Sequence, residues 1–208
     1  MKLCMIGTGY VGLVSGACFA DIGNQVYCVD KDKNKIDKLN LGVSPIYEPG
    51  LDELIKKNYD ANRLIFTTDI KKAINASDLI FICVGTPTKK GSLKVDLSFV
   101  YKCVKEVLKH TKKKKIIITK STVPVGTGAE IEKIIKKKKK LFSVISNPEF
   151  LREGEAIRDF RYPDRIVIGS DNKSEFKMMK KLYSPLISKG AKFFTTSRKG
   201  AELIKYAS

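Results

Sequence analysis

Short apolar runs recur along the chain, and most of them are separated by segments in which apolar residues have a helical spacing. Near-continuous apolar runs are typical of strands that are buried on both faces of a sheet. The runs lie at positions 3–6, 26–29, 64–66, 79–84, 116–119, 141–146, 166–168 and 192–194. Their recurrence predicts one sheet built from strands that are far apart in the sequence.

Between these runs, apolar residues return every three or four positions, which is the period of an amphipathic helix. The helical segments lie at 10–22, 51–57, 97–108, 129–135 and 175–182. Strands that alternate with helices predict an α/β fold: a Rossmann-like, doubly wound, mostly parallel sheet with helices on both faces. Positions 41–50, "LGVSPIYEPG", are rich in turn residues and predict a functional loop before a short helix.

The last residues of the chain repeat the helical spacing without a signal that ends a helix. Gly200, Leu203, Ile204 and Ala207 share one helix face, and no Gly, Asn or Pro follows them. We therefore expect a helix that continues past Ser208.

The cysteines are expected to be buried, reduced thiols. All five lie inside apolar strand-like or helix-like segments and none forms a CxxC pair: Cys4, Cys18, Cys28, Cys83 and Cys103. Such thiols are typical of a reducing compartment, which predicts a cytoplasmic location. No apolar run approaches the ~18 residues of a membrane span, so we expect no membrane partner.

The chain has 208 residues and a formal net charge of +18, and its lysines concentrate at 112–115 and 136–140. Both runs precede strand-like segments, so we interpret them as solvated helix ends and loops, where cations are favoured. We interpret His110 in the same way, as a solvated cation at a helix end. No nucleic-acid-reading motif accompanies the lysines, so binding to RNA or to a membrane surface is the least favoured interpretation.

The first loop of the predicted sheet contains a glycine motif. The sequence "CMIGTGYVG" places Gly7, Gly9 and Gly12 between the first strand and the first helix. In a G-x-G-x-x-G turn the first glycine permits the tight turn, the second lets a pyrophosphate approach the backbone, and the third lets the helix pack on the strand. The pyrophosphate then lies at the helix N-terminus.

Asp30 ends the second predicted strand, "QVYCVD", about 20 residues after the glycine turn. A carboxylate at this place accepts the ribose hydroxyls of NAD and repels the 2′-phosphate of NADP. Lys31, Lys33 and Lys35 leave the second cofactor possible, because each could pair with a phosphate. We favour NAD, since the carboxylate lies at the strand tip.

Three later strands are each followed by a loop that contains a proline and a side chain with a hydroxyl or carboxylate group. These loops lie at 85–87, 121–124 and 147–153. Ligands of open α/β sheets bind beyond the carboxyl ends of the strands. Glu149 and Glu153 would share a face if their segment were helical, and one of them could then act as a base. Arg152 between them could instead make a structural ion pair.

Together these motifs resemble those of a known family, the UDP-glucose 6-dehydrogenase branch of the nucleotide-sugar dehydrogenases. The resemblance is carried in order by "GTGYVGLVSGACFADIGNQVYCVD", "SPIYEPGLDELI", "VGTPT", "KSTVPVGTG", "NPEFLREGEAI", "RYPDRIVIG" and "AELIKYAS". It implies an oxidoreductase that converts UDP-glucose to UDP-glucuronate for polysaccharide biosynthesis. Two NAD take part, and a cysteine captures the aldehyde. It also implies a homodimer.

The resemblance implies roles for particular residues. The residues that match the family's NAD-binding residues are Gly7, Gly9, Tyr10, Val11, Gly12, Asp30, Lys35, Thr86, Thr122 and Glu153. Four residues resemble the family's catalytic residues: Thr122, Glu149, Glu153 and Lys205. In the family, the residue like Thr122 positions a water, the one like Glu149 acts as acid or base, and the one like Lys205 stabilises an oxyanion. The substrate loop is Glu149, Phe150, Leu151, Arg152 and Glu153, with Lys205 opposite. No metal is expected.

The resemblance also implies parts that this chain lacks. None of its cysteines fits the position of the nucleophile, and the asparagine partner of Lys205 would stand one position after Ser208. We therefore expect an NAD-binding domain over 1–196 and the start of a central dimerisation domain over 197–208. Such a fragment binds NAD and does not oxidise the sugar by itself. The alternatives are a GDP-mannose or UDP-N-acetyl-mannosamine dehydrogenase, or a non-catalytic NAD-binding module.

Overall fold

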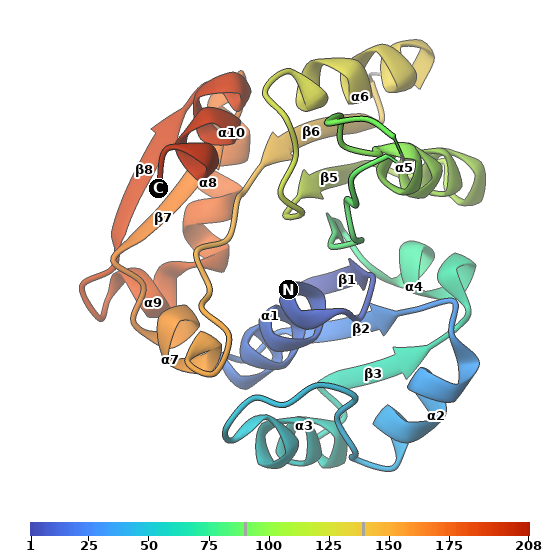
Figure 1. The fold of residues 1–208 in the computed structure, drawn as a ribbon, viewed down its shortest axis with the longest axis vertical. Helices are drawn as coiled ribbons and strands as arrows, with labels where there is room; N and C mark the ends of the chain where they lie inside the picture. Colours follow the sequence, from blue (N-terminus) through green and yellow to red (C-terminus); the bar gives the residue numbers. More distant parts are fainter. Residues whose placement is uncertain (90, 139) are drawn as a thin grey trace.

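The computed structural model describes residues 1–89, 91–138 and 140–208, and within these residues eight strands form one sheet in the order β3-β2-β1-β4-β5-β6-β7-β8 (Figure 1). The strands are β1 (Lys2–Ile6), β2 (Gln25–Val29), β3 (Leu64–Thr67), β4 (Leu79–Ile82), β5 (Lys115–Thr119), β6 (Phe142–Ser146), β7 (Arg165–Gly169) and β8 (Lys192–Thr196). Each of the eight predicted strands is confirmed, as is the mostly parallel α/β fold. Strands β1 to β6 pair in parallel.

Helices cover both faces of the sheet, as predicted. They are α1 (Tyr10–Asp21), α2 (Lys33–Asn40), α3 (Leu51–Asp60), α4 (Ile70–Ala76), α5 (Ser98–His110), α6 (Thr127–Ile135), α7 (Ala156–Arg161), α8 (Lys173–Leu182), α9 (Ser184–Ile187) and α10 (Arg198–Tyr206), with a 3-10 turn at Lys136–Lys138. Within the described residues, none of these helices has the length and apolar character needed to cross a bilayer.

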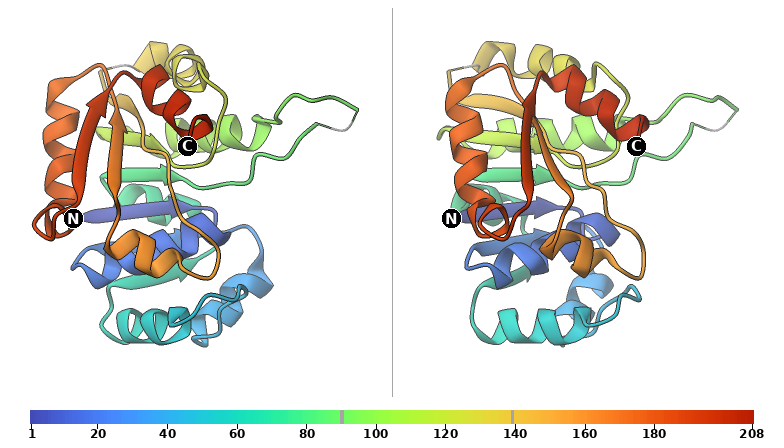
Figure 2. Two further views of the ribbon diagram at one scale, coloured as in Figure 1. Left: turned by 60° about the vertical axis from the view of Figure 1, so that its left-hand side comes forward. Right: turned by 90° about the vertical axis from the view of Figure 1, so that its left-hand side faces the viewer.

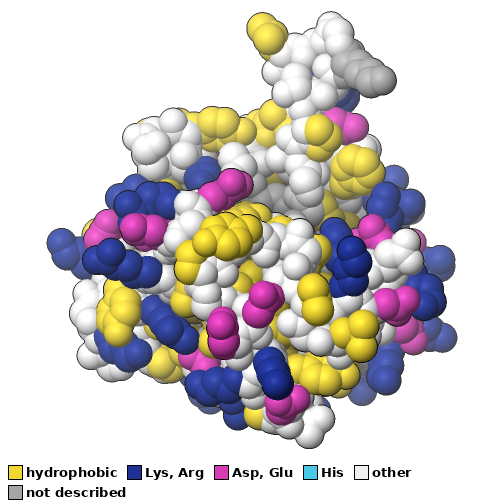
Figure 3. Space-filling view, turned by 60° about the horizontal axis from the view of Figure 1, so that its bottom comes forward, with side chains coloured by type: hydrophobic (Ala, Val, Ile, Leu, Met, Phe, Trp, Pro, Cys, Tyr) yellow, Lys and Arg dark blue, Asp and Glu magenta, His cyan; other side chains and the backbone are white. Residues whose placement is uncertain are grey.

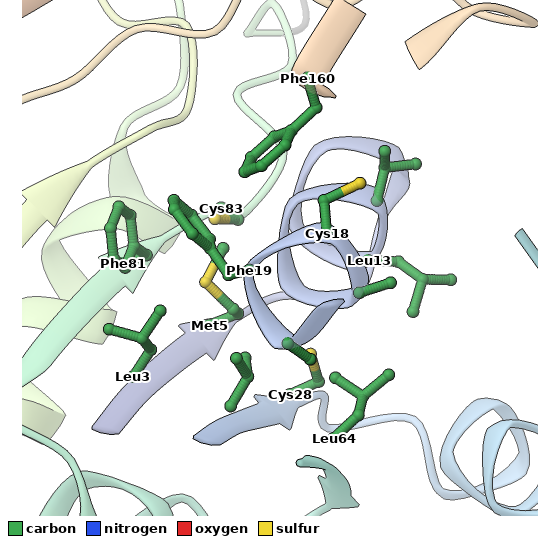
Figure 4. Close-up of a cluster of buried hydrophobic side chains, with 14 of the residues drawn as sticks. Leu3, Met5, Leu13, Cys18, Phe19, Cys28, Leu64, Phe81, Cys83 and Phe160 are labelled. Atoms are coloured by element: carbon green, nitrogen blue, oxygen red, sulfur yellow. The ribbon is translucent and has the colours of Figure 1, made fainter. Parts of the chain in front are cut away.

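Two apolar cores lie on the two faces of the sheet because successive strand residues point in opposite directions. In β1, Leu3 and Met5 belong to the core under α1 and α3, whereas Cys4 and Ile6 belong to the core under α4, α5 and α6. In the first core, Phe19 of α1 packs against other rings, and Phe160 meets it edge-on with centroids 4.9 Å apart (Figure 4). This packing holds the C-terminal half of α1 against the sheet.

The five cysteines are all buried and free, as predicted. Burial raises the pKa of Cys18 and Cys83 to about 12 and that of Cys103 to about 11. At neutral pH these thiols keep their protons, so they act as apolar side chains of the core.

The lysine runs lie where the sequence predicted, with one correction. Lys112–Lys114 follow α5 and are exposed, whereas Lys115 is buried at the start of β5 and donates to the carbonyl of Ser77. In the second run Lys136, Lys137, Lys138 and Lys140 are exposed, and Lys139 lies outside the described residues. Lys115 is buried because it belongs to β5 rather than to the loop before it. On the face in Figure 3, basic side chains are interspersed with acidic and apolar ones.

Strands β7 and β8 join the sheet in a different way. They are parallel to each other, but β7 is antiparallel to β6 and meets it at a single position, where Ser146 lies opposite Gly169. Most of β7 therefore extends past the carboxyl end of β6 instead of running beside it. The ribbon views show β7 and β8 standing beside the parallel part of the sheet (Figure 2).

Candidate functional site

The glycine turn has the geometry that its motif predicts. Gly7 adopts a left-handed φ of 101°, and its N–H donates to the carbonyl of Val29 over 2.8 Å. A Cβ on Gly12 would lie 1.9 Å from the carbonyl oxygen of Gly7, so only glycine lets α1 start this close to β1. A Cβ on Gly9 would meet no atom within 4 Å. The space above Gly9, at the N-terminus of α1, is therefore open for an anion.

Asp30 lies beside this turn and is held by several donors. Its Oδ2 accepts from the N–H of Thr8 over 3.0 Å and from the Thr8 hydroxyl over 2.8 Å, and Lys35 Nζ lies 3.1 Å away. Its Oδ1 accepts from the N–H of Asp32 over 3.1 Å, which leaves room for a ligand hydroxyl on that oxygen. Although burial opposes ionisation, these bonds lower the pKa of Asp30 to about 2.

The other two lysines near Asp30 have different surroundings. Lys33 forms an exposed ion pair with Asp37 at 2.6 Å, whereas Lys31 lies over the ring of Phe99, 5.7 Å from its centroid. Among the three lysines, Lys35 is therefore the one that pairs with Asp30 in this structure.

Replacing Asp30 by asparagine is expected to lower the free energy of unfolding by about 2 kcal/mol at pH 7, because the low pKa is itself a stability contribution. The folded pKa lies below the unfolded value, so this contribution is present above about pH 4 and is lost as the pH falls toward 2. Urea unfolding of the wild type and of Asp30→Asn should show that the difference between their free energies of unfolding becomes smaller from pH 7 to pH 3. A difference that stays constant over that range would contradict the assignment.

The glycine turn and Asp30 form one end of a cleft of about 650 Å³, here called the glycine-turn cleft. Its lining is mainly apolar and comes from the ends of β1, β2 and β4 and from one side of α5: Ile6, Gly7, Gly9, Val29, Asp30, Lys31, Lys35, Thr68, Ile70, Cys83, Val84, Gly85, Pro87, Phe99, Lys102, Cys103 and Glu106. A mainly apolar cleft with an open helix N-terminus and the Asp30 carboxylate beside it fits a dinucleotide that carries a pyrophosphate and an unphosphorylated ribose.

Hydroxyl groups tie the next two strand ends together. Thr86 donates to the carbonyl of Thr122 over 2.8 Å, and Ser121 donates to the carbonyl of Val84 over 2.7 Å. Thr86 and Thr122 are thus brought together near the cleft. The hydroxyl of Thr122 makes no hydrogen bond among the described residues that would compete with a ligand or a water.

A second cleft of about 710 Å³ lies where β7 extends past β6, and we call it the β6–β7 cleft. It is lined by Lys120, Asn147, Pro148, Glu149, Phe150, Leu151, Arg152, Glu155, Arg158, Asp159, Phe160, Tyr162, Pro163, Asp164, Arg165, Ile166, Tyr183 and Leu186. Burial lowers the pKa of Lys120, which faces Glu149 and Lys205. The predicted substrate loop forms one wall of this cleft.

Glu149 and Lys205 form a pair that the resemblance alone did not describe. Lys205 Nζ donates to Glu149 Oε1 over 2.9 Å and to the Glu149 carbonyl over 2.8 Å. Glu149 Oε2 accepts from the N–H of Leu151 over 2.6 Å. The ring of Phe150 lies beneath two cations, Arg165 at 4.5 Å and Lys205 at 5.5 Å. Lys205 therefore reaches the substrate loop from α10, and its ammonium is held by that loop in this structure.

The segment from Glu149 to Glu153 is not helical, so the two carboxylates do not share a helix face. Pro148 disfavours a helical conformation at Asn147, and the Leu151 N–H donates to the Glu149 side chain instead of to a helical carbonyl. The interpretation of Arg152 as their ion-pair partner was wrong: its guanidinium pairs with Glu155 at 2.9 Å and Asp159 at 2.7 Å instead. Glu153 is exposed.

Sequence reasoning missed several polar residues of the site. Glu48, inside the predicted loop 41–50, is buried and accepts from the N–H groups of Gly154 and Ile157. Glu202, one turn before Lys205, is buried against the start of α6. Thr8 lies inside the glycine motif. Each is a polar residue in a segment already singled out, but no residue-level pattern shows that its side chain points inward.

A family model described as "UDP-glucose/GDP-mannose dehydrogenase family, NAD binding domain" matches residues 1–187. Two curated relatives are named UDP-glucose 6-dehydrogenase. That of Rhizobium meliloti is 51% identical over all of this chain and 48% of its own length, and TuaD of Bacillus subtilis is 49% identical over 99% of this chain and 44% of its own length. The chain thus spans about half the length of the curated relatives it matches.

Solved structures agree with this likeness. The GDP-mannose dehydrogenase of Pseudomonas aeruginosa superposes with a TM-score of 0.93 at 36% identity, covering all of this chain and 49% of that one. The UDP-glucose dehydrogenase of Pyrobaculum islandicum gives 0.92 at 35% identity, covering 99% of this chain and 48% of that one.

Proposed function

Because this chain belongs to the UDP-glucose/GDP-mannose dehydrogenase family and is its NAD-binding domain, we propose that it is the NAD-binding half of a UDP-glucose 6-dehydrogenase. The observation that carries the proposal is the glycine turn with its anchored Asp30 at the same sheet edge as the Glu149–Lys205 pair. One edge thus offers a dinucleotide site and a charged pair beside it. The similar relatives that carry the name UDP-glucose 6-dehydrogenase favour that sugar.

The glycine-turn cleft would hold NAD. The pyrophosphate would lie above Gly9 and receive backbone N–H groups at the start of α1, including those of Tyr10 and Val11. Asp30 and Lys35 would contact the adenosine ribose, and Thr86, Thr122 and Glu153 the nicotinamide half. The bound cofactor supplies the acceptor of hydride.

The Glu149–Lys205 pair would handle the sugar. A partly buried lysine near a reacting carbon, as Lys205 would be, stabilises the oxygen that gains negative charge during oxidation. Glu149, which faces both Lys205 and Lys120, would exchange protons with that oxygen, and Thr122 would position a water. The loop from Phe150 to Glu153 would contact the sugar across the β6–β7 cleft.

We further propose a cytoplasmic homodimer that supplies UDP-glucuronate for polysaccharide biosynthesis. Five free, buried thiols support a reducing compartment. The residues 197–208 would then belong to the start of the central dimerisation domain, and residues 1–196 to the NAD-binding domain.

Two measurements test the proposal. The purified chain should bind NAD in isothermal titration calorimetry, with no NADH formed on addition of UDP-glucose. A chimera in which residues 1–208 replace the matching part of the Rhizobium meliloti relative should form two NADH per UDP-glucose. Turnover of GDP-mannose or UDP-N-acetyl-mannosamine instead would identify the alternative dehydrogenases. NAD binding without turnover of any sugar would favour a non-catalytic module.

In the same chimera, Lys205→Met is expected to lower kcat by about 10²–10³-fold, because it removes the cation nearest the reacting oxygen. The affinity for NAD should not change. Lys199→Met is the matched control, since Lys199 lies on the same helix but is exposed. Equal activities of the two variants would contradict the role of Lys205.

A further inference from the structure

Tyr10 connects the glycine turn to two segments that are distant in the sequence. It is the first residue of α1 and directly follows Gly9, but its side chain does not line the glycine-turn cleft. Its hydroxyl donates to Glu48 and accepts from the N–H of Gly154 over 2.9 Å, and it lies 3.3 Å from the carbonyl oxygen of Arg152. One rigid ring therefore spans from the anion-binding turn to the end of the substrate loop.

Glu48 is the centre of this junction. Its neighbours Tyr47 and Pro49 are exposed, whereas Glu48 is 6% exposed. Its Oε2 accepts from Tyr10 and, over 2.8 Å, from the N–H of Gly154. Its Oε1 lies 3.3 Å from the donating N–H of Ile157. These uncharged donors share one carboxylate.

Burying a carboxylate among uncharged donors is costly, and replacing one donor leaves the charge less well solvated. The contacts of Glu48 join the loop 41–50, the first turn of α1 and the segment 154–157. Tyr10 keeps its proton in this setting, since burial and the bond to Glu48 raise its pKa well above the usual range. The junction is therefore a fixed geometry at neutral pH.

We propose that Glu48 and Tyr10 are positioning residues that couple NAD binding to the order of the substrate loop. This inference rests on the proposed binding of NAD at the glycine turn. NAD that fixes the first turn of α1 also fixes the ring of Tyr10, and through Glu48 it fixes the amides of Gly154 and Ile157. Coupling between two sites is reciprocal, so an ordered substrate loop strengthens NAD binding by the same factor.

Amide hydrogen exchange followed by NMR tests this coupling with NAD itself as the probe. In the wild-type chain, saturating NAD is expected to slow exchange at Gly154 and Ile157 by about fivefold or more, which is the lower range of measured coupling factors. Tyr10→Phe keeps the backbone N–H at position 10, so this variant and Glu48→Gln should still bind NAD, more weakly by the coupling factor, while the slowing falls below about twofold. The amides of β1 report in each variant that the fold is intact.

The chain offers a matched control in a second tyrosine–glutamate pair. Tyr101 on α5 donates to Glu130 on α6, and among the described residues neither has a hydrogen bond or ion pair to the substrate loop. Tyr101→Phe should respond to NAD as the wild type does. The same slowing at Gly154 in Tyr10→Phe as in the wild type would overturn the coupling. If the wild-type chain did not bind NAD at all, the proposed function itself would fail. If it bound NAD and the variants behaved as the wild type does, only the coupling would fail, so the two outcomes are distinguishable.

Discussion

Gly9→Ala leaves the chain folded and weakens NAD binding by about 10- to 100-fold. The fold is expected to tolerate a methyl group at Gly9, where a Cβ meets no atom within 4 Å and φ is an ordinary −73°. The same open space is the place for the pyrophosphate, so the methyl group would clash with the ligand alone. Overpacking of this kind costs about 1–3 kcal/mol, and the stated loss of affinity, about 1.4–2.7 kcal/mol, lies within that range.

Gly12→Ala is expected to act mainly on the stability of the fold rather than on the ligand. Its Cβ would lie 1.9 Å from the Gly7 carbonyl oxygen, which is backbone and cannot turn aside, so α1 would have to move away from β1. We expect a loss of about 3 kcal/mol or more in the free energy of unfolding. NAD binding would be lost with the turn.

Urea unfolding and calorimetric titration of NAD on both variants separate these effects. Gly9→Ala should unfold at the same urea concentration as the wild type and bind NAD weakly, whereas Gly12→Ala should unfold earlier. Neither Gly23→Ala nor Gly85→Ala is a suitable control, because Gly23 has a φ of 94° and Gly85 lines the same cleft as Gly9. Unchanged NAD affinity in Gly9→Ala would contradict the placement of the pyrophosphate.

Glu202→Ala is expected to lower the free energy of unfolding by about 3–5 kcal/mol, the usual cost of breaking a buried, hydrogen-bonded charge network. Glu202 is 3% exposed and accepts from the N–H of Gly126 over 2.6 Å and from that of Gly128 over 2.7 Å. These amides begin α6, where a carboxylate also interacts favourably with the helix dipole. Removing the carboxylate leaves the buried amide of Gly128 and the partly buried amide of Gly126 without this acceptor.

Removing the Glu202 carboxylate would also affect the contact between Lys205 and the substrate loop. Glu202 and Lys205 lie three residues apart on one face of α10, so the bonds of Glu202 to α6 fix the position from which Lys205 reaches Glu149. Urea unfolding is again the measurement. Glu53→Ala is the control, because Glu53 is exposed in the first turn of α3 and should cost less than about 1 kcal/mol. Equal midpoints for the two variants would contradict the role of Glu202.

The sheet and the glycine turn could be predicted from the sequence because local rules determine them. Apolar runs locate the strands, and the steric needs of Gly7 and Gly12 follow from a motif with known geometry. The short helices α2, α4, α7 and α9 were not predicted, since each has too few turns for a helical period to stand out. The N-capping aspartates of α2 and α4, Asp32 and Asp69, were the available signal.

The polar contacts of the site could not be predicted because they join residues far apart in the sequence. Arg152 stands between two glutamates in the sequence, but the extended loop turns it toward Asp159. Glu48 lies between the exposed residues Tyr47 and Pro49, and Gly154, its partner, is more than a hundred positions away. Periodicity describes which face of an element is buried, not which backbone amide a distant carboxylate meets.

The single paired position between β6 and β7 has a consequence for how the enzyme family diversifies. Side chains join the two parts of the sheet there: Asn147 donates to the Val167 carbonyl over 3.1 Å, and Tyr183 donates to Asn147 over 2.6 Å. A change in the tilt of β7 and β8 would therefore require few ladder hydrogen bonds to be rebuilt. Substitutions in β7 and β8 can therefore change the shape of the β6–β7 cleft while the pairing of the six parallel strands stays as it is.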